Sequence, residues 1–465
     1  MNAHLASHHS RRLLLVVTLL AWLLPGLGTL PRLATAAETI PQPSLERLRK
    51  GLPIAAQRER VDLAMPVFSH PTRITNPLFP ISQLHSTVLL GHIDRRTFRT
   101  ETTLLPDTRT IEWMGRRIEC QVSQYTAYLD GRIEEVALDF YAQADDGAVW
   151  YLGEDVYNYE DGVIADRAGT WIAGDDGPPA MIMPAQPRSG DVFRPENIPG
   201  VVFEEVRVLA TSQGMDGPRG RVSGAITTQE LGMDGGLSYK TFAPGYGEFS
   251  TGHDGELEAL AVAVPTDARK GPMPAELEAL ALGAEQVFDA ARSGDWPLAT
   301  KAAQRMQQAW RSFRADAAPP PMLAAHMDRT LGALEGDALA PALSARHAGG
   351  AQRASLAASL AALDLQLLYR PPVQVDRDRL QVWARQLLFD TGIPDSGPVA
   401  GDVTTLEWIR DRIVRSLGAG DARAIDLQLK ALRTAADAED LEASRQLAPR
   451  LLHAIAGMQI LSSQP

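Results

Sequence analysis

The chain has 465 residues, of which 45% are hydrophobic and 22% charged, a length that predicts two or three domains and excludes wholesale disorder. Its 45 basic and 57 acidic side chains give a net charge of −12 with no basic tract, which argues against nucleic acid as a partner. One cysteine, Cys120, excludes a disulfide framework and any site with several thiolate ligands.

Residues 1–36 have the pattern of a secretory signal peptide. Arg11 and Arg12 precede an apolar run from Leu13 to Leu24, and Ala34-Thr35-Ala36 supplies small residues for a signal peptidase. We therefore expect a periplasmic or secreted protein, whose mature chain carries a net charge of −15 because cleavage removes three arginines and no acid. The run is shorter than the roughly 20 residues of a membrane span, so no stable span is expected after cleavage. An uncleaved anchor and export by the twin-arginine route are the alternatives.

Residues 37–83 are expected to form an extended lead-in, and residues 84–264 a β domain. The second range contains short alternating runs rich in Val, Ile, Thr and aromatics. Several joints carry Asp-Gly pairs that supply the positive φ of tight hairpin turns; they are Asp130-Gly131, Asp146-Gly147, Asp161-Gly162 and Asp254-Gly255. Strands joined by turns, with no helix between them, predict an antiparallel sheet, strongly curved or closed into an open β-barrel.

The lone cysteine lies in one of these alternating runs, from Arg117 to Val122. The alternation places Cys120 on the same strand face as Ile118 and Val122, so we expect a buried small hydrophobe. A catalytic thiol would need a partner histidine, and the sequence indicates none.

After a linker at residues 265–271, the sequence from 272 to 465 is rich in Ala, Leu and Arg and is predicted to be helical. Four Gly-Asp pairs suggest helix joints, since glycine suits the residue after a helix and aspartate caps the next one; they are Gly294-Asp295, Gly336-Asp337, Gly401-Asp402 and Gly420-Asp421. Their irregular spacing disfavours a repeat and favours a bundle. The predicted fold class is thus α+β, with a curved antiparallel sheet or open β-barrel followed by an all-α helical bundle.

A series of motifs in residues 76–250 resembles an uncharacterised family of exported bacterial β-rich proteins. The motifs are Asn76–Pro80, Phe140–Gln143, Gly147–Glu154, Gly169–Gly174, Met181–Ala185 and Phe242–Gly247. The resemblance implies secretion and a β-rich fold, with no established activity. The chain departs from the family pattern at Tyr246-Gly247-Glu248 and at Asp175-Asp176, and it carries the helical half, which many relatives lack.

Aromatic residues are dense in the middle of the β domain. Trp150, Tyr151, Tyr157 and Trp171 lie within 22 positions, and aromatics this dense bury large areas or line an apolar cavity. They are therefore either filler of the concave face or a binding site for an apolar small molecule or a segment of an envelope protein.

Histidines on three predicted helices suggest a second kind of site. His326, His347 and His453 are accompanied by methionines, and facing helices of a bundle hold metal or haem with such residues. Core and surface positions are the alternative for all three. The absence of Cys-x-x-Cys-His excludes covalent haem, and no cofactor is predicted.

Carboxylates also cluster near the aromatics, namely Asp145, Asp146, Glu154, Asp155, Glu160, Asp161, Asp175 and Asp176. Solvated turns, a calcium site and a hydrolase acting through Asp145 and Glu154 are the three interpretations.

In the helical half, Asp364, Arg370, Arg385, Glu407 and Arg410 suggest a charged network. No sequence motif of a hydrolase or nucleotide-binding protein is present, which lowers the expectation of an enzyme. The sequence favours an exported non-catalytic binding or envelope-interaction protein, with a metal- or haem-binding bundle and a carboxylate-dependent hydrolase as alternatives.

Overall fold

The computed structural model describes residues 54–253, 256–338 and 345–461. The predicted signal peptide, residues 37–53 of the predicted lead-in and the Asp254-Gly255 turn lie outside these ranges. No helix within them is long and apolar enough to cross a membrane.

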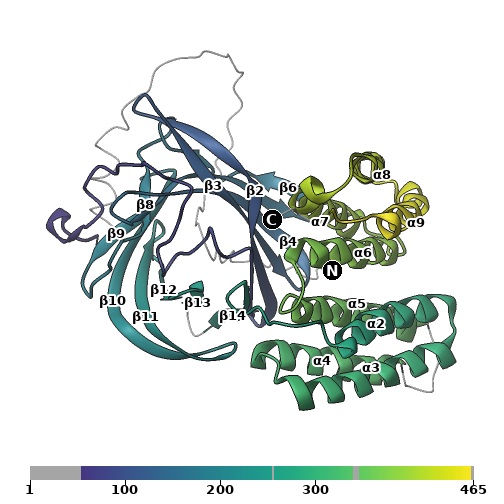
Figure 1. The fold of residues 1–465 in the computed structure, drawn as a ribbon. Helices are drawn as coiled ribbons and strands as arrows, with labels where there is room; N and C mark the ends of the chain where they lie inside the picture. Colours follow the sequence, from purple (N-terminus) through teal and green to yellow (C-terminus); the bar gives the residue numbers. More distant parts are fainter. Residues whose placement is uncertain (1–53, 254–255, 339–344, 462–465) are drawn as a thin grey trace, which may run out of the picture.

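The described residues have the predicted α+β architecture, with fourteen strands followed by eight α-helices (Figure 1). The strands are β1 (Ser86–Ile93), β2 (Arg96–Trp113), β3 (Arg116–Leu129), β4 (Arg132–Gln143), β5 (Val149–Glu160), β6 (Val163–Asp166), β7 (Trp171–Ile172), β8 (Ala180–Met183), β9 (Val192–Ile198), β10 (Val202–Gly217), β11 (Gly220–Gly232), β12 (Leu237–Ala243), β13 (Gly247–His253) and β14 (Glu256–Val264). The helices are α2 (Ala275–Ser293), α3 (Trp296–Ala317), α4 (Pro321–Ala338), α5 (Ala345–Gln366), α6 (Pro372–Asp390), α7 (Ser396–Ile413), α8 (Ala419–Asp437) and α9 (Leu441–Gly457), with 3-10 turns at η1 (Gln57–Glu59) and η2 (Val414–Ser416).

The strands form one large, open, antiparallel sheet. Its order is β6-β5-β4-β3-β2-β1-β14-β13-β12-β11-β10-β9, so that the first and last strands of the β half pair in the middle. Asp130-Gly131 and Asp161-Gly162 adopt positive φ in the hairpin turns, as predicted. Register shifts in β2 and β10 bend the sheet, since bulges increase local twist. The short strand β8 pairs with β5 and contacts β9, which brings the two ends of the sheet together.

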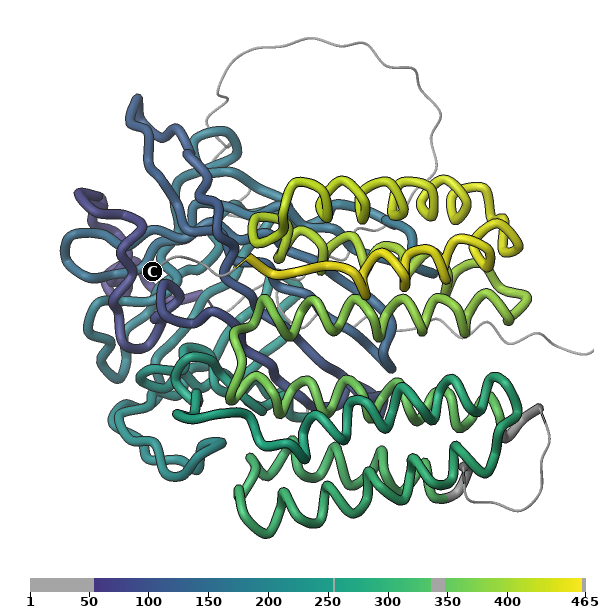
Figure 2. Tube along the Cα trace, turned by 45° about the vertical axis from the view of Figure 1, so that its right-hand side comes forward, coloured from purple at the N-terminus to yellow at the C-terminus, as the bar shows by residue number. Residues whose placement is uncertain are grey.

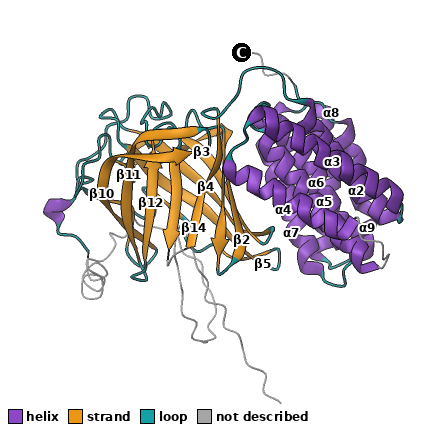
Figure 3. Ribbon diagram, turned by 90° about the horizontal axis from the view of Figure 1, so that it is seen from below, coloured by secondary structure: helices purple, strands orange, loops and turns teal. Residues whose placement is uncertain are grey.

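The helices pack against one side of the outer face of this sheet, beside β2, β4 and β5, and do not extend over β10–β12 (Figure 3). One hydrophobic cluster joins Val88, Leu90 and Val262 of the sheet to helices α2–α5. Another joins Ile133 and Val136 to helices α6–α9. Figure 2 shows the two groups as a lower layer with α2–α4 in green and an upper layer with α8 and α9 in yellow. The helical half is thus two groups that share the sheet as their packing surface.

The Gly-Asp pairs are helix joints at fewer places than predicted. Gly294 ends α2 with a φ of 78°, and Asp295 caps α3 by accepting a hydrogen bond from the Leu298 amide at 3.1 Å. The joint predicted at 336–337 is wrong, since α4 runs through it to residue 338. The joint at Gly401-Asp402 is also wrong, because both residues lie inside α7. Gly401 instead lies against the β5–β6 turn, and its backbone leaves no room for a side chain at Gly162 of that turn.

A buried ion network fastens the sheet to both helix groups. Arg379 of α6 donates to Asp364 at 2.9 Å and to Asp376 at 2.8 Å. Arg99 on the outer face of β2 also donates to Asp364, at 2.6 and 2.8 Å, and Arg412 of α7 donates to Glu101 of β2 at 2.6 Å. Three arginines thus meet three carboxylates, and nearby arginines hold the pKa of Glu101 well below its usual range despite its burial.

The predicted charged network of the helices is correct only for Asp364. The other four residues instead form separate, partly exposed pairs. Those pairs are Arg370–Asp378, Arg385–Glu285, Glu407–Arg433 and Arg410–Asp426. Cys120 is fully buried together with Ile118 and Val122, as the alternation predicts.

Candidate functional site

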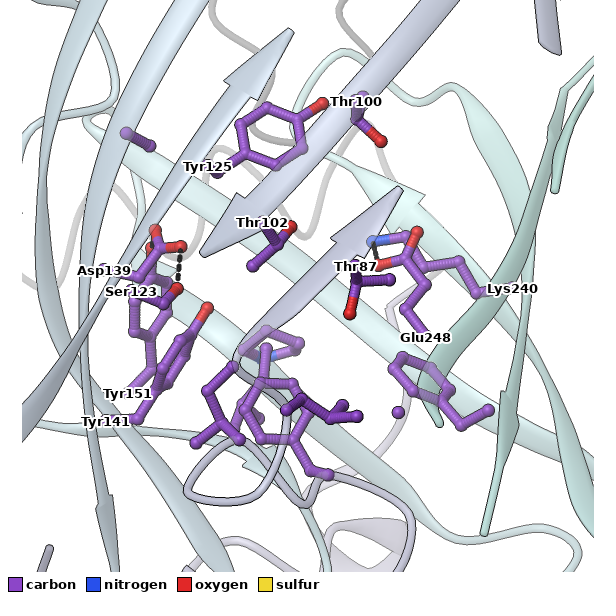
Figure 4. Close-up of a pocket in the computed structure, with 18 of the residues that line it drawn as sticks. Thr87, Thr100, Thr102, Ser123, Tyr125, Asp139, Tyr141, Tyr151, Lys240 and Glu248 are labelled. Carbon is purple, nitrogen blue, oxygen red and sulfur yellow. Dashed lines mark hydrogen bonds and ion pairs between the residues drawn. The ribbon is translucent and has the colours of Figure 1, made fainter. Parts of the chain in front are cut away.

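A cavity of about 140 Å³ lies on the concave face of the sheet. Its walls come from strands at both ends of the sheet, and the lead-in segment 79–84 forms its base. Asn76 fixes this segment, since its side-chain amide donates to the carbonyls of Gly147 and Pro184 at 3.0 Å each. In Figure 4, Ser123, Asp139, Tyr141 and Tyr151 lie on one side of the cavity, while Lys240 and Glu248 lie on the other.

The base of the cavity is apolar and aromatic. Phe79 packs edge-on against Tyr141 with ring centroids 4.9 Å apart, and Tyr141 stacks on Tyr151 at the same distance. Leu84 and Phe242 complete this part of the wall. Such a surface suits the apolar body of a small molecule.

The rest of the lining is rich in carboxyl groups. Strand alternation turns Thr100 and Thr102 of β2 inward, while their neighbours Arg99 and Glu101 face the helices. The inward-facing carboxyl residues are Glu135, Asp139, Glu154, Glu196, Glu204, Glu230, Glu248 and Glu258. Lys240 is the one basic residue among the described residues that line the cavity. The site therefore carries a large excess of acidic groups over basic ones.

Some of these carboxyl groups have protein partners. Lys240 lies 3.0 Å from Glu230 and 3.9 Å from Glu248, so the lysine balances carboxylate charge on one wall of the cavity. On the other wall, Asp139 accepts hydrogen bonds from the Tyr151 hydroxyl at 2.7 Å and from Ser123 at 3.2 Å. Burial nevertheless raises the pKa of Asp139 to about 6.

Other polar atoms of the lining have no partner. Glu196 is 2% exposed, and its Oε1 makes no hydrogen bond within the described residues; the same holds for the Tyr125 hydroxyl. Burial, together with the charge of Glu204, raises the pKa of Glu196 to about 8. Burial and the neighbouring Glu248 likewise raise the pKa of Glu258 to about 8. The buried carboxyl groups of the cavity therefore stay protonated at neutral pH unless a cation replaces the protons.

The structure brings two of the four predicted aromatic residues to the cavity region. Tyr151 lines the cavity, and Trp171 packs edge-on against it at 5.4 Å while donating its indole N–H to Glu154 at 3.2 Å. Trp150 is buried in the adjacent core. Tyr157 contacts Trp408 of α7, with ring centroids 5.0 Å apart, and so belongs to the contact with the helices.

The predicted metal-site histidines are not brought together. His326 lies on α4, where burial lowers the pKa of its imidazole to about 4, and His453 is exposed on α9. His347 lies in the first turn of α5, and its side chain is outside the described part of the structure. Across the described ranges, no group of three or more His, Cys, Asp or Glu residues is placed to hold a metal ion.

The predicted carboxylate cluster divides into turn residues, two residues of β5 outside the cavity (Asp155 and Glu160) and one cavity residue. Asp145 is exposed and accepts hydrogen bonds from Ser69, whereas Glu154 is buried in the cavity wall. No sequence motif singled out Glu135, Asp139 and Glu196 as site residues. Their signal is an acidic residue inside a β run, at a position where alternation predicts the inner face.

Comparison of the chain with models of known protein families finds no match, and a search of curated proteins finds no similar sequence. The family resemblance of residues 76–250 therefore stays a prediction.

Proposed function

We propose that this protein is an exported, non-catalytic binding protein whose β half takes a small molecule on its concave face. The observation that carries the proposal is the cavity itself, which the side chains of the described residues leave unfilled. An apolar cavity of roughly 150 Å³ accommodates a molecule of the size of benzene. The signal-peptide pattern of residues 1–36 supports export.

The polar lining gives a second argument for a guest. Native proteins leave few buried polar atoms without partners, and those that remain mark a functional role or a bound species. Glu196 Oε1 and the Tyr125 hydroxyl are two such atoms in the lining of one cavity. A ligand with an apolar body and a polar group can pack against the aromatic base of the cavity and also form hydrogen bonds with these unpaired atoms.

Ligand-observed NMR with a library of small neutral, cationic and anionic fragments tests the proposal. Thr102→Trp places a large side chain in the cavity, and Thr110→Trp, on an exposed position of the same strand, is the matched control. We expect fragments that bind the natural chain and the control and that no longer bind Thr102→Trp. Fragment binding that is equal in all three proteins, or absent from all three, contradicts the proposal.

A further inference from the structure

We propose that the ligand of this cavity is an organic cation, an amine with a small aromatic or aliphatic body. This inference rests on the proposed binding function and names the chemical class of the ligand. It follows from the balance of charge in the cavity, from the partner that one buried carboxyl lacks, and from the spacing of the acidic groups.

The charge balance leaves one wall without a protein cation. Lys240 lies against Glu230 and Glu248 on the wall of β11–β13. On the opposite wall, Glu135 and Asp139 face the cavity with no lysine or arginine among its described lining residues. Because buried carboxylates without a counter-charge are unfavourable, this wall requires either protons or a cation from outside.

Glu196 supplies the observation that points directly to a ligand. Its side chain is almost completely buried, yet none of the described residues donates a hydrogen bond to Oε1. The groups that face it are Glu154 on β5, Asp139 on β4, Glu204 on β10 and Lys240 on β12. Glu154 shares a side-chain hydrogen bond with Glu196, but Oε1 is left without a donor and three of these four groups are acidic. An ammonium group supplies the donor that Oε1 lacks and the missing positive charge.

The spacing of the acidic groups favours an organic cation over a metal ion. No three of the described carboxylates converge as ligands of one ion. They are spread over several strands above an aromatic base, where Tyr141 and Tyr151 are stacked. An aromatic face also attracts an ammonium group, so the base and the walls select for the same ligand.

Isothermal titration calorimetry with benzylamine, benzyl alcohol and benzoate tests this inference, because the three probes share one apolar body. At about pH 8 we expect benzylamine to bind at least tenfold more tightly than benzyl alcohol and benzoate not to bind. We also expect benzylamine to release protons on binding, detected as a dependence of the heat on the buffer, because the cation replaces protons held by the carboxyl groups.

Two variants locate the effect. Glu196→Gln is expected to weaken benzylamine binding about tenfold and leave benzyl alcohol binding unchanged, and Glu135→Gln is the second variant if the first fails to fold. Glu112→Gln, an exposed change on β2, is the matched control and is expected to bind all three probes as the natural chain does.

The outcomes separate this inference from the proposed function. If benzyl alcohol or benzoate binds as tightly as benzylamine, and Thr102→Trp abolishes that binding, the cation inference is wrong and the binding function stands. If no probe or fragment distinguishes the natural chain from Thr102→Trp, both are wrong. Calcium chloride that binds with micromolar affinity and displaces benzylamine overturns the inference in favour of a metal ion.

Discussion

The two faces of the sheet handle buried charge in opposite ways. On the outer face, three arginines meet three carboxylates, and the pKa of Asp364 is lowered by Arg99 and Arg379 against the effect of burial. On the inner face, eight carboxyl residues share one lysine, and burial raises the pKa of Glu196 and Glu258. The two faces meet on β2, where Arg99 and Glu101 face the helices while Thr100 and Thr102 line the cavity. The charges that join the sheet to the helices balance one another within the protein. The carboxyl groups of the cavity, by contrast, need protons or a cation from solution to balance their charge.

The largest expected effect comes from removing one arginine from the buried ion network on the outer face of the sheet. Arg379→Met leaves Asp364 and Asp376 without their shared partner, and we expect a loss of about 3–5 kcal/mol in the free energy of unfolding, measured by urea denaturation. The matched control is Arg415→Met, whose pair with Asp107 is mostly exposed and which we expect to cost less than about 1 kcal/mol. Similar losses in the two variants would show that the buried network contributes no more than a surface pair.

A second prediction concerns the opposite pH dependence of the two faces. The pKa of Glu258 rises from an ordinary 4.5 to about 8, so between these pH values the folded state holds a proton that the unfolded chain has released. The contribution of Glu258 to stability is therefore complete below about pH 4.5 and is lost as the pH rises toward 8. Asp364 has a lowered pKa, so its contribution is complete above its ordinary value of 3.8 and is lost as the pH falls below it.

Glu258→Gln tests the inner half of this prediction. The groups that face Glu258 are Glu248, Lys240 and Thr100, and glutamine keeps an acceptor for the Thr100 hydroxyl. Urea denaturation across about pH 5 to 8 is expected to show a smaller fall in stability than in the natural chain, by on the order of 1–3 kcal/mol. A slope identical to that of the natural chain would mean that Glu258 is ionised throughout, and the acidic cavity would then be hydrated rather than short of cations.

The third prediction concerns the contact between the sheet and helix α7. Gly131 and Gly162 occupy equivalent Asp-Gly turns, with φ of 73° and 76°. A Cβ at Gly131 meets no atom within 4 Å, whereas one at Gly162 lies 2.1 Å from the Gly401 amide of α7. Gly131→Ala is expected to cost about 1 kcal/mol for its backbone conformation, and Gly162→Ala about 1–3 kcal/mol more from displacement of α7.

Thermal denaturation of the two glycine variants side by side measures this difference. Because the turns share their backbone geometry, the conformational term cancels and only the contact with α7 remains. Equal melting temperatures would mean that α7 moves aside freely and that the helices are loosely seated on the sheet.

The sequence predicted the strands, their antiparallel order and the helical half, because alternation and Asp-Gly turns are local signals. It did not predict the acidic cavity. Asp139 and Glu196 are 57 residues apart and lie on strands that meet only because β8 brings the ends of the curved sheet together. The prediction of a helix joint at Gly401-Asp402 was wrong for the same reason. Gly401 packs against the backbone of Gly162, which is far away in the sequence, and does not end a helix. Long-range geometry of this kind leaves no periodic trace in one sequence.

Cys120 has a practical consequence. It is the sole cysteine of the chain, it is completely buried, and burial raises the pKa of its thiol to about 12. Thiol reagents need the exposed thiolate, so their rate of reaction reports how often the β half opens far enough to uncover β3. The natural chain therefore carries its own single-site reporter of opening. A bound ligand that holds the two cavity walls together would slow the modification of Cys120, although it does not contact this residue.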